Sequence, residues 1–420
     1  MAEGGGVSVA NGGGIFMAEG GSVSFANGGV SVSVADGGVG VANGDGGACV
    51  ANGGGCLGFG RSSPDPVSKG HDYDEEECAD LEPFFFDEAE AIADNERRMQ
   101  REQEEARKLE LRILAANVNK AVRDKIRDDD PKQGGAYYNR FFLADFSTFD
   151  IDEESPLEPM RYTDRVYKKD EPRWPLLAVD FLSVKIVSLD VDFPIHVYGT
   201  VIARDSLDCK CIYLFQRDED NCQLINSECE SLILTGPKRG LVLVGDAYVE
   251  TDLKIKDHQR HEVKELSKGV FGIPGIAGRQ LDKCKIESKL LATRLSTVEV
   301  MYAVVKDAVE ATIAIEVLQG DFYGKITACT SSIQSSIVLH DSEVSGVMTC
   351  DGKRVIQLLR RVVAICLKEK LEVTVVAQTG DVECKNTVDF TPSLCGRGKG
   401  EITVGATKML VEVTWSVLDT

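Results

Sequence analysis

The sequence predicts a mainly β fold: an antiparallel β-sandwich or barrel in the C-terminal part, preceded by a disordered and partly helical N-terminal region. From residue 175 to residue 420, short runs rich in Val, Ile and Leu alternate with turn signals, and no long helical pattern interrupts them. The first 60 residues hold 21 of the 41 glycines and neither Lys nor Arg, which is not a globular composition. Charged residues with helical spacing fill much of the region between these two parts.

Residues 1–70 repeat a small unit, seen at 7–13, 23–29 and 32–38, in which Val alternates with Ser or Ala before an Asn-Gly-Gly or Asp-Gly-Gly sequence. The unit alternates like a strand and ends like a tight turn, so a small β-solenoid is one interpretation. The repeats are irregularly spaced, however, and carry little apolar bulk to offset the entropy lost on ordering so many glycines. We therefore expect this segment to be disordered.

Residues 71–86 form an acidic segment, and the charge of the whole chain is unevenly divided. The net charge is −21, of which −15 falls on residues 1–174 and −6 on residues 175–420. A negative field of this kind repels phosphate backbones and anionic lipid surfaces, so we expect neither nucleic-acid nor membrane binding. The acidic segment, with its three Phe residues at 84–86, is typical either of an interaction segment for a protein partner or of a solvated tail.

Residues 87–130 predict one long charged helix. Apolar residues recur every seven positions at Ile92, Met99, Ala106 and Ile113, and Pro131 follows the pattern. The second core position of each heptad, three residues after these, is apolar only in the second half of the helix. The pattern is thus compatible with weak coiled-coil self-association through residues 92–116 or with a largely solvated helix.

The linker at residues 131–174 is rich in aromatic residues. They could dock on the surface of the β-rich domain as an extended strap, or form an exposed recognition segment for another protein. Because exposed aromatic side chains are costly, we favour the strap. The aromatic side chains concerned are Tyr137, Tyr138, Phe141, Phe142, Phe146 and Phe149.

The β-rich domain, residues 175–420, contains many short runs with β-branched enrichment. The run 355–363 also fits a helical period, and the similarity of segments 249–255 and 309–315 leaves a duplicated sheet conceivable. The expected strands are 177–190, 195–204, 209–216, 231–235, 241–256, 294–305, 309–318, 322–330, 335–340, 353–367, 371–379, 385–390, 400–406 and 409–417.

The cysteine pattern and the apolar runs bear on localisation. The thirteen cysteines are odd in number and scattered, so they show no disulfide framework. The first residues lack the basic and apolar regions of a signal peptide, and no apolar run approaches about 20 residues. We expect free thiols in the cytoplasm or nucleus, without a transmembrane segment.

Residue types that carry chemistry are sparse. The only histidine cluster, His258 and His261, stands among lysines and lacks further ligands at metal-binding spacing, so we assign no metal and no cofactor. No hydrolase, metalloprotease, kinase or nucleotide-binding motif is present, and we assign no catalytic residue. Two basic glycine loops could contact an anion or a partner, because mobile backbone amides beside cations hold anions. The candidate residues are Lys238 and Arg239 in the first loop and Arg397 and Lys399 in the second.

Several separated segments of the β-rich domain resemble, in order, the uncharacterised plant domain of grasses called domain of unknown function 6598. The resemblance covers roughly residues 175–418 and implies a plant origin, with no activity or catalytic residue to carry over. Some members of that family join this domain to a ribosome-inactivating N-glycosidase domain, which this chain lacks. The segments that carry the resemblance are 181–187, 193–205, 236–240, 320–328 and 404–409.

Two functions follow as hypotheses. The first is a non-enzymatic intracellular β-domain that binds a protein or a small ligand, with the N-terminal half as an acidic recruiting arm. The alternative, implied by the family resemblance alone, is an accessory domain in ribosome-inactivating (rRNA N-glycosidase) or defence function in plants.

Overall fold

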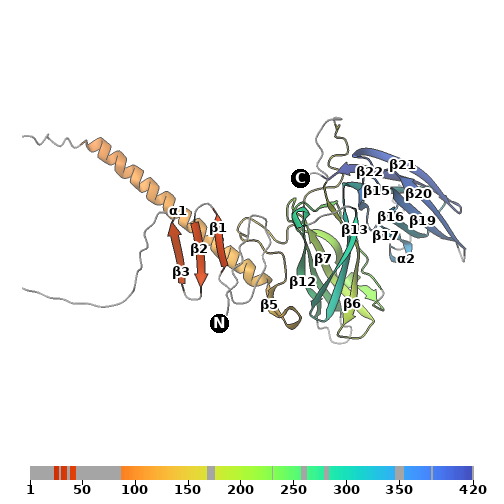
Figure 1. Cartoon of the computed structure of the whole chain (residues 1–420), viewed down its shortest axis with the longest axis horizontal. Coiled ribbons are helices and arrows are strands. Elements are labelled where there is room, and N and C mark those ends of the chain that lie inside the picture. The colour runs from red at the N-terminus through yellow and green to blue at the C-terminus, as the bar shows by residue number, and fades with distance from the viewer. Residues whose placement is uncertain are drawn as a thin grey trace, which may run out of the picture. The chain divides into compact units, whose positions relative to one another are not determined.

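The computed structural model (Figure 1) describes residues 23–27, 30–35, 38–43, 87–167, 176–228, 230–256, 263–278, 283–345, 354–379 and 382–418. The chain divides into two compact units, Met1–Glu110 and Leu111–Thr420. The described residues form mainly β structure in several antiparallel sheets, which confirms the predicted fold class, and none of these sheets closes into a barrel. None of the described helices is both long enough and apolar enough to cross a membrane.

The glycine-rich segment contains three short antiparallel strands in the order β1-β2-β3. They are β1 (Val23–Asn27), β2 (Val30–Ala35) and β3 (Gly38–Asn43). These strands follow the alternation of Val with small residues. The expected disorder of residues 1–70 stays a prediction. The rest of residues 1–86, the acidic segment 71–86 included, lies outside the described residues.

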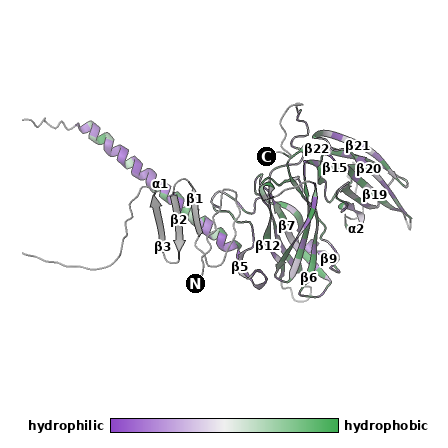
Figure 2. Ribbon diagram, in the orientation of Figure 1, coloured by the Kyte–Doolittle hydropathy of each residue, from purple (hydrophilic) through white to green (hydrophobic). Residues whose placement is uncertain are grey.

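Helix α1 (Glu88–Ile126) occupies most of the range expected to be helical. Its first turn is capped by Asp87, whose Oδ1 accepts hydrogen bonds from the backbone N–H groups of Ala89 and Glu90 at 2.9 and 3.3 Å. Most of its surface is hydrophilic (Figure 2). The apolar residues Ile92 and Ile113 are 54% and 55% exposed. Self-association through residues 92–116 stays a prediction.

The segment after α1 folds back onto the sheets. Strands β4 (Arg127–Asp130) and β5 (Gly135–Tyr138) flank the short 3-10 helix η1 (Pro131–Gln133). Phe146 and Ile151 are buried with Ile126 in a small core. The Phe141 ring lies 4.6 Å from the Tyr248 ring, centroid to centroid. Residues 139–163 are therefore a docked strap, which is the first of the two alternatives stated for the aromatic-rich linker.

The first sandwich packs a sheet of order β10-β6-β14-β13 against one of order β12-β11-β7-β8, with β9 also paired to β7. Apolar residues of both sheets form one core, Phe181 and Val298 from the first and Val201 and Val249 from the second. The elements are β6 (Ala178–Leu189), β7 (Ile195–Arg204), β8 (Ile212–Arg217), η2 (Glu219–Asn221), β9 (Gln223–Ile225), β10 (Leu241–Val242), β11 (Ala247–Lys256), β12 (Val263–Ile273), η3 (Ile276–Gly278), β13 (Lys285–Thr293) and β14 (Ser296–Val305).

The second sandwich packs a sheet of order β18-β15-β22-β21 against one of order β17-β16-β19-β20. Its separate core includes Ile313 and Trp415 from the first sheet and Ile326 and Val375 from the second. The elements are β15 (Ala308–Gln319), β16 (Gly324–Thr330), β17 (Ile337–Asp341), α2 (Ser342–Ser345), β18 (Val362–Cys366), β19 (Leu371–Thr379), β20 (Val382–Phe390), β21 (Cys395–Val404) and β22 (Thr407–Val417).

The two sandwiches share one topology. When β9 is set aside, β6, β7, β8, β10, β11, β12, β13 and β14 take the same places, in the same chain order, as β15 to β22. The β-rich domain is therefore a tandem repeat of an eight-stranded unit. The similar segments at 249–255 and 309–315 do not mark the repeat, because they lie in β11 and β15, and the counterpart of β11 is β19.

A short connection and a shared core join the sandwiches. Only Lys306 and Asp307 separate β14 from β15. Ala178, Ala303 and Ala364 lie in a buried cluster drawn from both sandwiches. The small side chains let the two sheets approach closely at this junction.

Some observed strands differ from those expected from the sequence. β12 and β13 were missed because charged residues such as Lys268 and Glu287 interrupt the apolar alternation that we used as the signal. The segment 231–235 is not a strand, since only Ser231 pairs there, opposite Lys185. The helical alternative for 355–363 is wrong, because Val355 bridges Glu316 and β18 begins at Val362.

Candidate functional site

A cleft of about 520 Å³ lies where the two sandwiches meet. One wall comes from β6, the segment 231–234 and Met301 of β14. The other wall comes from the start of β16, from β17 with the residues before it, from α2 and from residues 359–360. The lining residues are Leu182, Ser183, Lys185, Ser231, Leu232, Ile233, Leu234, Met301, Lys325, Ser335, Ser336, Ile337, Val338, Asp341, Val344, Leu359 and Arg360.

Three cationic side chains line the cleft, and they differ in their interactions with the rest of the chain. Arg360 is buried and donates to Asp180 and to the backbone oxygen of Phe181. Lys325 Nζ lies 3.3 Å from Asp341 Oδ2. Lys185 is half-buried, stands opposite Glu299 of β14 in the sheet register, and forms no ion pair in the described part of the chain. Lys185 is therefore the cation in the cleft that remains available to a ligand.

The rest of the lining is apolar side chains and serine hydroxyl groups. Leu182, Met301 and Leu359 are half-buried, so their exposed parts offer apolar surface to a ligand. Hydroxyl groups both donate and accept hydrogen bonds, and four serines line the cleft. The arrangement suits a ligand that has an apolar face and a negatively charged group.

Arg239 and Lys238, which we predicted to contact an anion or a partner, both lie against carboxylates of the chain itself. Arg239 is 1% exposed, and its Nη1 and Nη2 lie 2.6 and 2.9 Å from the two oxygens of Asp205. Its Nε lies 3.3 Å from Ser155 Oγ in the strap. Lys238 Nζ lies 2.9 Å from Glu154 Oε1. This loop therefore fastens the strap to the first sandwich.

Arg397 and Lys399 belong to strand β21 rather than to a loop, which corrects the sequence-based assignment. Lys399 Nζ lies 3.1 Å from Glu412 Oε2 on β22, and Arg397 is exposed. A Cβ placed on Gly400 would lie 2.7 Å from Val388 Cγ2. Gly400 therefore lets β21 pack closely against the side chains of β20. This packing explains the glycine, and the sequence pattern does not reveal it. The structure does not join these two cations to Lys238 and Arg239 in one site.

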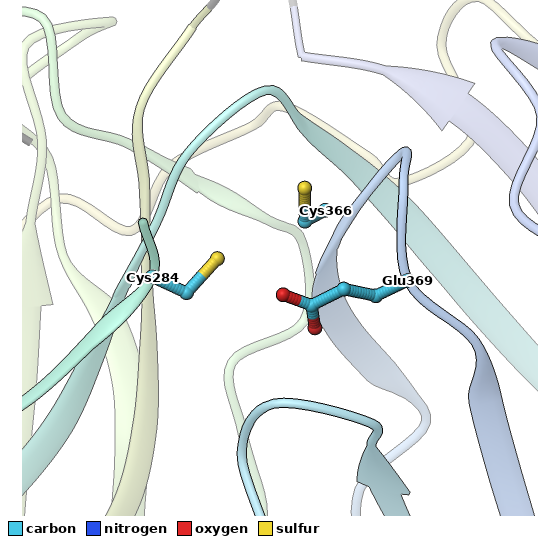
Figure 3. Close-up of side chains that lie close together, drawn as sticks. All are labelled: Cys284, Cys366 and Glu369. Atoms are coloured by element: carbon cyan, nitrogen blue, oxygen red, sulfur yellow. The ribbon is translucent and has the colours of Figure 1, made fainter. Parts of the chain in front are cut away.

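The structure brings together a second group that we did not predict from the sequence: Cys284, Cys366 and Glu369 (Figure 3). The two Sγ atoms and a carboxylate oxygen of Glu369 all lie within 4.8 Å of one another. Figure 3 shows the three side chains converging from three segments. We call these residues the thiol-carboxylate cluster.

The three members of the thiol-carboxylate cluster are positioned by turns and strand ends. Cys284 directly precedes β13, and Cys366 is the last residue of β18, opposite Ala308. The N–H of Glu369 donates to the Cys366 oxygen at 3.0 Å, in the turn that leads to β19. Burial raises the pKa of the Cys284 thiol to about 12, and the nearby Glu369 and Cys366 add to this increase.

No sequence pattern indicated this cluster. Cys366 and Glu369 stand three residues apart, and this spacing alone indicates no metal site. Cys284 is distant in the sequence and reaches the other two only because the sandwiches meet. A contact between two segments so far apart in sequence requires the tertiary structure.

The family model of the domain of unknown function 6598 (DUF6598) matches residues 178–413, more than half of the chain. The chain belongs to this family. The match begins at the first residue of β6 and ends within β22, so the DUF6598 domain comprises both sandwiches. No curated protein and no solved structure matches the chain.

The DUF6598 domain contains both candidate sites. The lining residues of the cleft and all three members of the thiol-carboxylate cluster fall within the matched range. Helix α1 and the strap precede it. The tandem repeat thus creates the junction at which both sites are found.

Proposed function

We propose that this chain is a non-enzymatic, intracellular binding protein whose cleft between the sandwiches takes a ligand with an apolar face and a negatively charged group. The observation that carries this proposal is the cleft itself, with the half-buried Lys185 among apolar and hydroxyl side chains. A half-buried cation that forms no ion pair attracts an anion more strongly than an exposed lysine does.

The intracellular part of the proposal is supported by the thiols. The described cysteines are free, among them Cys284 and Cys366, whose sulfurs lie within 4.8 Å of each other. Free thiols so close together are typical of a reducing compartment. The N-terminal half, with a net charge of −15, serves in this proposal as the arm that recruits a basic protein partner.

The cleft is tested with 8-anilinonaphthalene sulfonate, a dye that joins an apolar ring system to a sulfonate. We expect one saturable site on the folded full chain, read as an increase in dye fluorescence. Replacing Lys185 by Glu should weaken binding at least tenfold, because the variant puts a like charge beside the sulfonate. Lys325→Glu should weaken it less, since Lys325 already faces Asp341.

The matched control is Lys399→Glu, which makes the same charge change on β21. Circular dichroism in the near ultraviolet must be unchanged in all variants, because partly unfolded proteins also bind this dye. Equal dye affinity for Lys185→Glu and Lys399→Glu would exclude the cleft as the binding site.

The recruiting arm needs a separate experiment. Removal of residues 1–86 keeps all residues of α1, the strap and both sandwiches, whereas a cut at residue 174 would also remove the strap. In this proposal a chain that begins at residue 87 loses its basic protein partners and keeps its affinity for the dye. Recovery of the same partners by both chains would exclude residues 1–86 as the recruiting part of the arm.

A further inference from the structure

We propose that Cys284, Cys366 and Glu369 bind one zinc ion, and that this ion fastens the two sandwiches to each other. The inference is independent of the ligand in the cleft. It rests on three observations: the mutual distances of the donor atoms, a buried carboxylate oxygen without a hydrogen bond of good geometry, and the position of the cluster at the connection between the sandwiches.

The distances suit a small tetrahedral ion. Zinc–sulfur bonds of about 2.3 Å place two thiolate ligands about 3.8 Å apart in a tetrahedral site. The donor atoms of the cluster lie within 4.8 Å of one another. Shifts of about 1 Å, within the range of small side-chain rotations, would bring them to coordination distance.

The donor set points to zinc among the common metals. Two thiolates are soft ligands and select zinc or copper(I) over magnesium and calcium, which prefer oxygen. One carboxylate oxygen adds a harder ligand that zinc also accepts. Three protein ligands leave the fourth tetrahedral position for water or for a ligand oxygen.

Glu369 is held in a way that leaves one oxygen for a metal. Ser332 Oγ donates to Oε1 of Glu369. Within the described residues Oε2 is buried and accepts no hydrogen bond of good geometry, and the group that interacts with this carboxylate is the Cys284 thiol. A buried carboxylate oxygen without such a hydrogen bond is costly, and a metal ion would satisfy it. The hydroxyl group of Ser332 orients the carboxylate, as groups around metal ligands commonly do.

The cluster straddles the connection between the sandwiches. Cys284 belongs to the first sandwich, and Cys366 and Glu369 belong to the second. Cys366 pairs with Ala308, the residue that follows the connecting residues Lys306 and Asp307. The N–H of Leu367 donates to the Asp307 oxygen at 3.0 Å. A metal held by all three ligands would therefore restrict movement of one sandwich about this connection.

The test uses the full chain, reduced and stripped of metal with a chelator, and cobalt(II) as a spectroscopic substitute for zinc. We expect one equivalent of cobalt with a thiolate-to-metal charge-transfer band, and zinc should displace it. Cys284→Ser, Cys366→Ser and Glu369→Gln should each weaken binding about tenfold or more. Glu369→Gln tests the site with little risk to folding, because it keeps the shape of a side chain in a turn.

The matched control is Cys384→Ser, which removes another half-buried thiol, on β20, and should leave cobalt affinity and spectrum unchanged. Zinc should also raise the unfolding temperature of the wild type and of the control, but not of the three ligand variants. Cobalt affinity that is the same in wild type and in Cys284→Ser, or a cobalt spectrum without the charge-transfer band, would overturn the proposal.

Discussion

Asp180 of β6 and Arg360, just before β18, form a buried ion pair that joins the two sandwiches. Both side chains are at most 4% exposed, and the second oxygen of Asp180 accepts a hydrogen bond from the Ala364 N–H at 3.2 Å. Arg360 also donates to the backbone oxygens of Phe181 and Val362. The pair therefore satisfies polar groups of both sandwiches at the place where they meet.

Replacing Arg360 by Met should lower the free energy of unfolding by about 3–5 kcal/mol, because Asp180, whose pKa is raised by burial, would lose the partner that offsets this burial. The measurement is the urea midpoint of unfolding. Arg361→Met, at the exposed neighbouring position, is the control and should change stability by less than about 0.5 kcal/mol. A double variant, Arg360→Met with Asp180→Leu, should recover much of the loss. Similar stability of the two single variants would refute the assigned role.

Glu250 of β11 holds the strap to the first sandwich. Its carboxylate lies 2.7 Å from Arg204 Nε and 3.0 Å from Arg140 Nε, and it accepts from the Phe141 N–H at 2.9 Å. Glu250→Gln should release the strap and destabilise the fold by about 3 kcal/mol, since two guanidinium groups lose their counter-charge. Hydrogen exchange should accelerate at residues 139–151.

The control for this prediction is Glu401→Gln. Glu401 is exposed and pairs with Lys408 on the surface of the second sandwich, where an ion pair contributes little. Exchange in the strap should stay as in the wild type. Unchanged protection of residues 139–151 in Glu250→Gln would show that aromatic packing alone holds the strap.

Attachment of β4 and of the strap to the first sandwich should weaken in acid, and Asp128 of β4 is one cause. Burial opposes ionisation of Asp128, but hydrogen bonds from Arg294, from the Asp129 N–H and from Lys268 outweigh it and hold its pKa well below the ordinary value. A depressed folded-state pKa adds stability above the ordinary carboxyl pKa of about 4, and this stability is lost as the pH falls below it. Burial also opposes ionisation of Glu250, but the hydrogen bond and the charge of Arg204 outweigh it and lower the pKa of Glu250. Glu250 therefore also adds stability that is lost in acid.

The measurement for this pH dependence is the urea midpoint between pH 5 and pH 3, where wild-type stability should fall. Asp128→Asn should make the fall shallower, because the titrating group is gone. Asp164→Asn removes an exposed carboxylate and should leave the slope unchanged. An equal slope in Asp128→Asn and the wild type would contradict the prediction.

Gly400 of β21 should not tolerate a branched side chain. A Cβ at this position would lie 2.7 Å from Val388 Cγ2 and 3.2 Å from Phe390 Cζ. Gly400→Val should therefore destabilise the second sandwich by about 1–3 kcal/mol, measured by thermal unfolding. Arg397→Val, at an exposed position of the same strand, is the control. Equal unfolding temperatures of Gly400→Val and Arg397→Val would mean that β20 and β21 can move apart at little cost.

Much of the fold could be predicted from the sequence, because alternation of apolar and polar residues is a local signal. β7 and β19 were expected nearly at their observed limits. β13 was not, since its solvent-facing residues break the alternation with Lys and Glu. The tandem repeat was also not predicted from the sequence, because two units can share a topology without having similar side chains.

The candidate sites could be predicted only in part. Arg239 stood out in a basic loop, and only the folded chain shows that its guanidinium faces Asp205. Lys185 did not stand out, because it is one lysine within a strand pattern. Cys284 and Cys366 were seen as scattered thiols, since nothing near either one indicates the other.

The sequence by itself determined the class of the fold, the charged helix and the membership of the DUF6598 family, because each depends on local patterns or on segments in order. Only the tertiary structure decided that the strands form two sandwiches of equal topology and that a cleft and a thiol-carboxylate cluster lie at their junction. The physical reason is that pairing between distant strands, and the burial of Asp180 with Arg360, depend on the packing of the whole domain rather than on neighbouring residues.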